Sequence, residues 1–150
     1  MKKFVKATLG VTLLEVMLVL AIAAMIIVMS VRYYQSAQAA NQANSIVQAV
    51  TGVVAASDSL AQASGSYVGT VSTANVQALV PTNSMTTPWG TAMTIAVNSA
   101  SSYTLTVPGV PQNVCPLMRS KLSANSHFTA LTACNAAGTT NFTTTYIANP

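Results

Sequence analysis

The sequence predicts an α+β fold in which one long N-terminal helix packs, through its second half, on a small antiparallel β-sheet. From residue 11 to residue 63 the chain holds no proline and only one glycine, Gly52, so nothing ends a helix there. Apolar residues recur at spacings of three and four in the second half of this segment. Apolar and polar residues alternate on both sides of residues 98–102, as in a half-buried strand pair. A chain of 150 residues has room for one such domain.

The chain begins with a short basic stretch that leads into an apolar segment. Half of its six positive charges fall in the first ten residues, at Lys2, Lys3 and Lys6. Residues 11–31 are then apolar, with polar interruptions only at Thr12, Glu15 and Ser30. This run has the length of a transmembrane helix. It exceeds the apolar stretch of about 7–15 residues found in an ordinary secretory signal.

We expect a single helix over residues 11–64, roughly 80 Å long at 1.5 Å per residue. Its first part, residues 11–31, is apolar on all sides, whereas its second half is amphipathic. The face expected to pack on the sheet carries small and apolar residues, at Ala37, Ala40, Ala43, Ile46, Val47, Val50, Val53 and Val54. No compact domain of this size encloses such a helix, so only the second half is expected to be covered by the globular head.

Glu15 is the one charged residue of the apolar run. A carboxylate inside a membrane costs several kcal/mol unless it is paired with a cation. Glu15 is therefore a candidate functional residue.

Residues 65–150 are expected to form a globular α+β head. Residues 65–89 are predicted to form a connecting loop that contains a short helix at 73–80, ended by Pro81. Strands are expected at about 92–97 and 103–107, joined as an antiparallel hairpin.

The C-terminal part of the head is expected to alternate between helix and strand. Residues 111–122 could form a short helix that carries Cys115, with Pro116 tolerated in its first turn. Residues 128–134 and 141–147 are strand candidates because they are rich in β-branched and aromatic residues.

Composition argues against catalysis and against metal binding. The chain has one histidine, one aspartate and one glutamate, which are His127, Asp58 and Glu15. No serine lies in the G-x-S-x-G context of a hydrolase nucleophile, and a calcium site needs several carboxylates. Loss of the basic first ten residues would leave a net charge of +1 from the original +4, too little for a nucleic-acid surface. We therefore expect no enzyme, no cofactor and no strong nucleic-acid signal.

The two cysteines and the cations of the head leave several interpretations open. Cys115 and Cys134 fit one disulfide in an oxidising compartment, two buried free thiols, or a zinc site with His127 that lacks a fourth ligand. Arg119, Lys121 and His127 are the only cationic side chains of residues 65–150. They fit a solvated surface, or a contact with another subunit or with DNA.

Residues 10–20 have the sequence Gly-Val-Thr-Leu-Leu-Glu-Val-Met-Leu-Val-Leu, which closely resembles the class III signal of type IV prepilins. In that family a dedicated peptidase cuts after the glycine and methylates the new amino terminus. The resemblance implies cleavage after Gly10 and N-methylation of Val11. The fifth mature residue of the family is a glutamate, and Glu15 is the fifth residue counted from Val11.

A mature chain that begins with valine, rather than phenylalanine, looks more like the type IVb branch than the type IVa branch. Pilins of the type IVa branch also carry a glycine and a proline in the membrane part of the helix, and this sequence has neither between residues 11 and 51. Residues 88–90, 103–107 and 110–115 are similar to type IVb pilins of the conjugative thin-pilus kind.

The resemblance implies the pilin fold and a structural subunit of a type IV pilus. Residues 1–10 would be a cleaved leader, and residues 11–31 would first span the inner membrane and then form the core of an extracellular filament. The filament serves adhesion, motility or conjugative contact in the family. The implied partners are identical subunits, a prepilin peptidase, an assembly ATPase and an inner-membrane platform.

The resemblance also assigns roles to three residues of the mature chain. It favours a disulfide between Cys115 and Cys134, since type IV pilins commonly bridge a C-terminal region in this way. We expect Glu15 to pair with a Val11 amine in the filament core, either its own or that of a neighbouring subunit. That attraction would set the axial register during assembly.

Two alternatives stay open at the level of the sequence. A pseudopilin or minor pilin of a type II secretion or DNA-uptake system shares every N-terminal feature. A secreted soluble binding protein would instead follow from ordinary signal-peptidase cleavage at the A-x-A patterns ending at Ala23 or Ala39. The two alternatives differ in the mature amino terminus.

Overall fold

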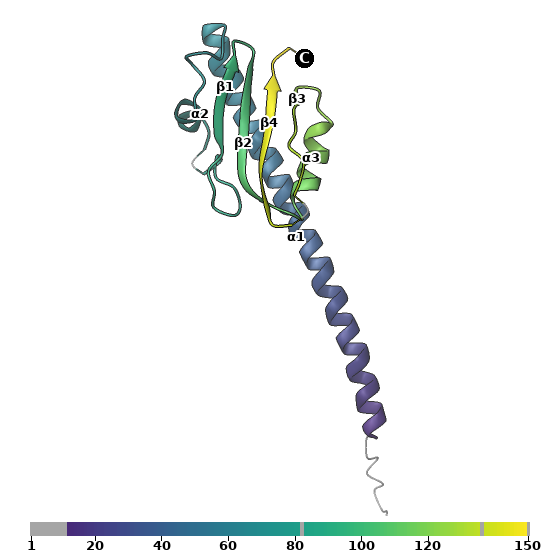
Figure 1. Cartoon of the computed structure of the whole chain (residues 1–150). Helices are drawn as coiled ribbons and strands as arrows, with labels where there is room; N and C mark the ends of the chain where they lie inside the picture. Colours follow the sequence, from purple (N-terminus) through teal and green to yellow (C-terminus); the bar gives the residue numbers. More distant parts are fainter. Residues whose placement is uncertain (1–11, 82, 136, 150) are drawn as a thin grey trace, which may run out of the picture. The chain divides into compact units, whose positions relative to one another are not determined.

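The computed structural model describes residues 12–81, 83–135 and 137–149, and it has the expected α+β architecture (Figure 1). A long helix of 52 residues, α1 (Leu13–Ser64), forms the N-terminal part of the described chain. The chain divides into two compact units, residues 1–37 and residues 38–150. The first unit consists, in its described part, of the first half of α1 and the residue before it. The second unit contains the rest of α1 and the head.

The head is built on a four-stranded antiparallel sheet with the order β1-β2-β4-β3. Its strands are β1 (Thr94–Ser99), β2 (Ser102–Pro111), β3 (Phe128–Thr129) and β4 (Thr139–Ile147). β1 and β2 form the predicted hairpin, in which Ser99 pairs with Ser102. β2 then pairs along its whole length with β4, so strands from the middle and the end of the chain form the centre of the sheet.

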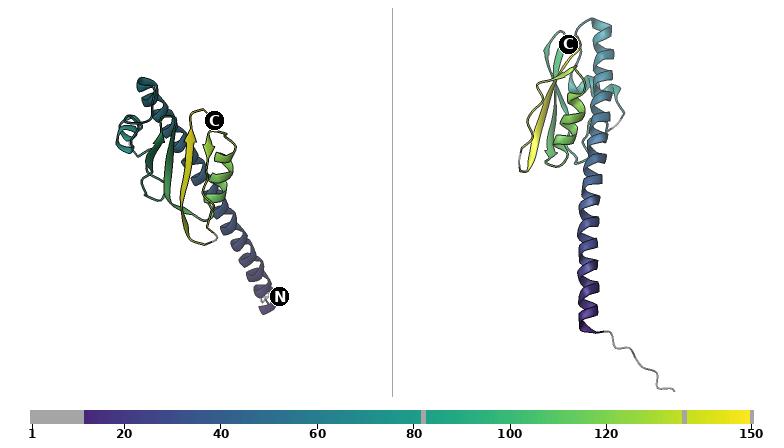
Figure 2. Two further views of the ribbon diagram at one scale, coloured as in Figure 1. Left: turned by 45° about the horizontal axis from the view of Figure 1, so that its top comes forward. Right: turned by 90° about the vertical axis from the view of Figure 1, so that its right-hand side faces the viewer.

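The second half of α1 lies along one face of this sheet (Figure 2). Its buried residues recur at alternating spacings of four and three, at Ala39, Ala43, Ile46, Val50, Val53 and Ser57. The predicted face was therefore correct in period and slightly rotated: Ala37 is exposed, and Ala40, Val47 and Val54 are only half-buried. The difference arises because the helix buries one narrow stripe, and these four residues lie at or beyond its margins.

The sheet buries alternate side chains against this stripe. β2 contributes Tyr103, Leu105 and Val107, and β4 contributes Phe142 and Tyr146. Two threonines of β4 are also buried, and their hydroxyls are hydrogen-bonded. Thr144 Oγ1 donates to the Thr129 carbonyl at 3.2 Å, and Thr140 Oγ1 accepts from the Asn135 amide at 3.0 Å. These two buried hydroxyls are therefore paired, whereas the buried Tyr103 hydroxyl has no hydrogen-bond partner among the described residues.

Two short helices lie beside the edges of the sheet, α2 (Thr73–Leu79) next to β1 and α3 (Cys115–Ser123) next to β3 (Figure 1). The outer edge of β1 is partly occupied. The Ile95 amide donates to Thr73 Oγ1 at 3.0 Å, and the Met93 amide donates to the Met85 carbonyl at 2.8 Å. Residues from α2 and from the following loop thus take up backbone donors that a further strand would need.

Two sequence-based expectations for the C-terminal part were wrong in their bounds. Residues 111–122 were expected to be helical, but Pro111 ends β2, where it pairs with Thr139, and α3 begins only at Cys115. Residues 128–134 were expected to be a strand, but β3 stops at Thr129. Ala130 follows with a φ of 51°, a left-handed conformation that turns the chain out of the strand.

Trp89 accounts for an irregularity in β2. The pairing of β2 with β4 shifts between Val107 and Val110, and the Trp89 Nε1–H donates to the Pro108 carbonyl at 2.9 Å. A Cβ atom on Gly109 would lie 3.5 Å from Trp89 Nε1, and Gly109 has a φ of 68°. The indole therefore packs over the bulge at ordinary contact distance, and the positive φ rather than a lack of space explains why a glycine stands there.

Candidate functional site

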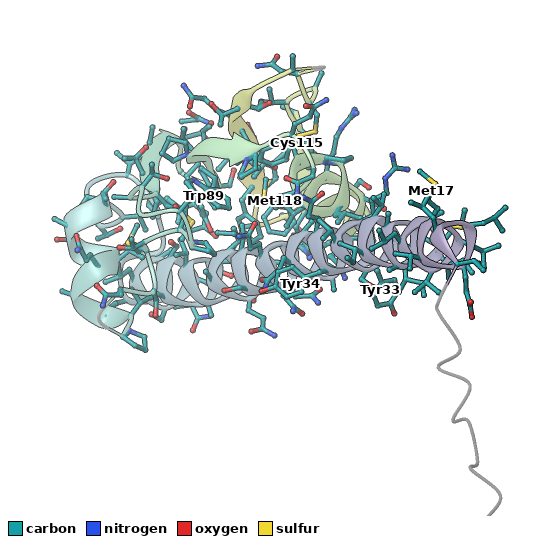
Figure 3. All side chains as sticks on the ribbon, turned by 90° about the horizontal axis from the view of Figure 1, so that it is seen from below. Met17, Tyr33, Tyr34, Trp89, Cys115 and Met118 are labelled. Carbon is teal, nitrogen blue, oxygen red and sulfur yellow. A yellow bond between two sulfur atoms is a disulfide. The ribbon has the colours of Figure 1, made fainter. Side chains whose placement is uncertain are left out.

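The first half of α1 presents a continuous apolar surface. Figure 3 shows the side chains of this helix, with Met17 and Tyr33 among those that project from it. Every residue from Thr12 to Gln38 is exposed except the half-buried Ala23. The large apolar side chains of this surface are Leu13, Leu14, Val16, Met17, Leu18, Val19, Leu20, Ile22, Met25, Ile26, Ile27, Val28, Met29 and Val31. We call residues 13–31 the apolar segment.

An apolar surface of this extent requires cover by lipid or by protein. Among the described residues, α1 is the one helix long and apolar enough to span a membrane. The apolar segment therefore suits a membrane anchor, and it is the candidate functional surface of the chain.

Glu15 lies in the first turn of α1, where its position is explained by helix capping. The Thr12 side-chain oxygen accepts from the Glu15 amide at 3.3 Å, and the Thr12 carbonyl accepts from the Glu15 and Val16 amides at 3.0 and 3.2 Å. A threonine followed three residues later by a glutamate is the capping-box pattern. A carboxylate in the first turn is also favoured by the helix dipole.

The capping residue is Thr12, and sequence reasoning missed it, although the spacing of Thr12 and Glu15 was a usable signal. Gly10 and Val11, the predicted cleavage and methylation sites, lie outside the described residues. The expected pairing of Glu15 with a Val11 amine therefore stays a prediction.

An aromatic pair follows the apolar segment. Tyr33 and Tyr34 are 81% and 65% exposed, and with Met29, Ser30 and Ala37 they line a shallow hollow of about 600 Å³ on α1. Arg32 precedes the pair. Tyrosine and arginine at the end of an apolar helix are typical of a membrane–water interface. Sequence reasoning missed this pair, although its position directly after residue 31 was a usable signal.

The two cysteines are joined by a disulfide, and their Cα atoms are 5.8 Å apart. Cys115 is buried in the first turn of α3, where Pro116 follows it, and Cys134 lies in the segment after β3. The bond ties α3 to this segment. Of the alternatives left open by the sequence, the structure contains the disulfide and not two free thiols.

Asp58 organises an aromatic cluster at the C-terminal end of α1. The Tyr67 hydroxyl donates to Asp58 Oδ1 at 2.5 Å, and the Tyr146 hydroxyl donates to Asp58 Oδ2 at 3.1 Å. The Tyr103 ring lies between the other two tyrosine rings, with centroids 5.1 Å from Tyr67 and 5.2 Å from Tyr146. His127 stacks on Tyr146 at 5.5 Å and makes a 2.7 Å hydrogen bond through Nδ1 with the Ile147 carbonyl.

The surroundings of the three tyrosines raise their pKa values and so favour the neutral hydroxyl form. Burial raises the pKa of Tyr146 to about 12, and the nearby charge of Asp58 and its hydrogen bond act in the same direction. Burial also raises the pKa of Tyr67, with a further contribution from its hydrogen bond to Asp58. For Tyr103, burial is again the main cause of a raised pKa.

The structure thus brings Asp58 and His127 to the same tyrosine, Tyr146, although they are far apart in the sequence. Asp58 accepts tyrosine hydroxyls, and the His127 ring is bound to a backbone carbonyl and stacked. These contacts account for both side chains as parts of the fold. In the described part of the chain, no three side chains of the His, Cys, Asp and Glu types come close enough to hold a metal ion.

Comparison with known proteins adds no family to these observations. No protein-family model matches the chain, and no match is found among curated proteins. A long apolar helix, a small antiparallel sheet and a disulfide in the head are compatible with the pilin fold.

Proposed function

We propose that this chain is the structural subunit of a type IV pilus, which polymerises through the first half of α1 into an extracellular filament. One observation carries the proposal: the apolar segment is exposed on all sides, and Glu15 is its single charge. Such a surface is stable in lipid before assembly and against the same surface of identical copies after it.

The sequence around Gly10 supports the route into the filament. Cleavage after Gly10 by a prepilin peptidase would remove three of the six positive charges and create a new amine at Val11. An assembly ATPase and an inner-membrane platform would then extract the subunit from the membrane. Valine at the mature amino terminus, with no glycine or proline between residues 12 and 51, supports the type IVb branch and an uninterrupted helix.

The proposal gives the Glu15 carboxylate a role beyond its favourable position in the first turn of α1. In a filament core without water, the Glu15 carboxylate needs a cation as its partner. In the mature sequence the nearest cation would be the Val11 amine. Removal of one partner of a buried ion pair typically costs about 3–5 kcal/mol, because the other charge is left unpaired. Glu15 would therefore set which positions along the filament a new subunit can occupy.

The test compares three variants of the full chain in cells that carry a type IV assembly machinery. Glu15→Val and Glu15→Gln should be cleaved and inserted into the membrane normally but should yield few filaments in the sheared fraction. Thr12→Val is the matched control, since it removes the side-chain cap of the same turn and leaves the carboxylate in place. It should assemble nearly as well as the wild type.

Each outcome has a distinct meaning. Equal losses for Thr12→Val and Glu15→Val would show that both variants act by weakening the first turn of α1. Normal filament numbers from fully cleaved Glu15→Val would refute the register role. A wild-type chain that never enters surface filaments would overturn the proposed function. The copy number of the chain in those filaments separates a major subunit from a minor pilin or pseudopilin.

A further inference from the structure

A cavity at the end of the head holds one of the two carboxylates of the chain. It has a volume of about 390 Å³ and lies where α1, the loop after α1, the β1–β2 turn and the end of β4 meet. Its lining includes Asp58, Gln62, Tyr67, Ser101 and Tyr146. We call it the Asp58 cavity.

Two tyrosine hydroxyls orient the Asp58 carboxylate, but no cation is paired with it within the described chain. Each of its oxygens accepts one tyrosine hydroxyl, at 2.5 and 3.1 Å, and a carboxylate has about four lone-pair sites. No cationic side chain of the described residues forms an ion pair with it. Asp58 is also only half-buried. The cavity therefore presents a fixed negative charge that still has acceptor capacity toward solvent.

The head carries two candidate cations of its own, both on α3. Arg119 and Lys121 are exposed, and neither has an ion-pair partner among the described residues. The buried residues of α3 are Cys115, Met118 and Leu122. At 100° per residue, Arg119 and Lys121 project from opposite flanks of this buried stripe.

Arg119 is the better match to a carboxylate cavity. Together with Ser123 and Cys134 it lines a second hollow, of about 520 Å³, beside the disulfide that fixes α3. A guanidinium is a planar fork that binds carboxylates through two parallel hydrogen bonds and stacks on aromatic rings, whereas an ammonium is a point charge. The Asp58 cavity offers both a carboxylate and tyrosine rings.

We propose that, in the filament, the Asp58 cavity of one copy receives the Arg119 guanidinium of a neighbouring copy. This inference rests on the proposed function, because it needs a polymer of identical chains. Asp58 and Arg119 belong to the same compact unit and do not meet within one chain, so the pair forms only between copies. Since each copy carries both groups at different places, the contact propagates from copy to copy without closing.

The first test measures filament yield for charge-removing variants of the full chain. Arg119→Gln should lower the yield about tenfold, as expected for an interfacial ion pair. Lys121→Gln is the matched control, because it removes the same charge from the other flank of the same helix, and it should match the wild type. The double variant Asp58→Asn with Arg119→Gln should be no worse than Asp58→Asn alone, since the contact is already lost in that single variant.

Arg119 decides the outcome, because it is exposed and its replacement leaves the fold intact. Asp58→Asn also weakens the tyrosine cluster, so its melting temperature is measured beside its yield. Equal yields for Arg119→Gln and Lys121→Gln would overturn the pairing. A yield of the double variant well below that of Asp58→Asn alone would overturn it as well, since Arg119 would then act independently of Asp58.

The second test detects the contact itself by cross-linking. Gln62→Cys on one tagged copy and Ser123→Cys on a second copy place thiols at the Asp58 cavity and beside Arg119. Oxidised filaments from co-expressing cells should contain a disulfide-linked dimer that carries both tags. Asn44→Cys, on an exposed face of α1, replaces Gln62→Cys in the control. Equal cross-linking with the control would count against the contact.

Wild-type chains that form no filaments would overturn the proposed function and this inference together.

Discussion

Asp58 joins three parts of the head through two hydroxyl groups. It lies in α1, Tyr67 lies in the loop that follows, and Tyr146 lies in β4. The Asp58 contact with Tyr146 spans 88 positions of the sequence. The cluster should therefore resist separation of α1 from the sheet for as long as its tyrosines keep their protons.

The head should lose stability at alkaline pH because of these tyrosines. The pKa of Tyr146 is raised from 10.0 to about 12. A raised pKa means that its contribution is fully present below pH 10 and is lost as the pH rises toward 12. Melting temperatures of the full chain in detergent, measured by circular dichroism across this range, should fall. The fall should be smaller for Tyr146→Phe than for the wild type, while Tyr33→Phe, at an exposed position of α1, should leave it unchanged. An equal fall in all three would rule out the cluster as its cause.

The roles of some of these residues could be predicted from the sequence, and those of others could not. The place of Glu15 at the start of the apolar segment follows from spacing alone, because helix starts obey local rules. The tyrosine partners of Asp58 do not follow from spacing. Tyr146 comes close to Asp58 only after β4 has paired with β2. The sheet determines that contact, and no local pattern predicts it.

At the scale of single elements, Gly52 weakens α1 without an evident packing reason. A Cβ atom added there would meet nothing within 4 Å. Gly52→Ala should therefore raise the free energy of unfolding by roughly 0.5–1 kcal/mol, through the lower backbone entropy of the unfolded chain. Gly109→Ala provides the contrast. Because Gly109 has a φ of 68°, an alanine there should lower the free energy of unfolding by about 1–2 kcal/mol. Thermal melting of both variants tests the pair, and a stabilising Gly109→Ala would contradict the strain argument.

The disulfide adds a covalent link to a short helix that also packs on the core through Met118 and Leu122. α3 has nine residues, and β3, beside it, has only two. Reduction of the Cys115–Cys134 bond should lower the free energy of unfolding by about 3 kcal/mol on the chain-entropy model, and filament yield should fall with it. Denaturant titrations with and without reductant measure this. The double variant Cys115→Ala with Cys134→Ala should show no further response to reductant.

The elements themselves were predictable to different degrees. The long helix and the β1–β2 hairpin have strong periodicity and short-range contacts, and both formed as expected. The segment after β3 was composed like a strand, but the left-handed Ala130 ended the strand early. Its remaining contacts run partly through side chains, as when Thr132 Oγ1 donates to the Thr143 carbonyl at 3.1 Å. Composition does not distinguish this arrangement from a regular strand.

At the scale of the whole molecule, processing distinguishes a filament subunit from a soluble secreted protein. The mature chain should begin at Val11 with a methylated amine. In that case the basic leader stays in the cytoplasm, because positive charges flanking an apolar helix are retained there. Mass spectrometry of the mature chain gives the answer directly. A chain that starts at Ala24 or Ala40 would have lost most of the apolar segment and would contradict the pilin assignment.

The hydrogen bonds that occupy the edge of β1 should protect the chain against amyloid formation. If the chain polymerises as proposed, subunits at the growth site would expose their sheets to one another at high local concentration, which favours cross-β stacking. The Thr73 hydroxyl and the Met85 carbonyl already hold the Ile95 and Met93 amides. Strand addition at this edge would first have to break those bonds. Thr73→Val frees one amide, and dye-binding aggregates should therefore increase in that variant while the helix that drives ordered growth stays unchanged.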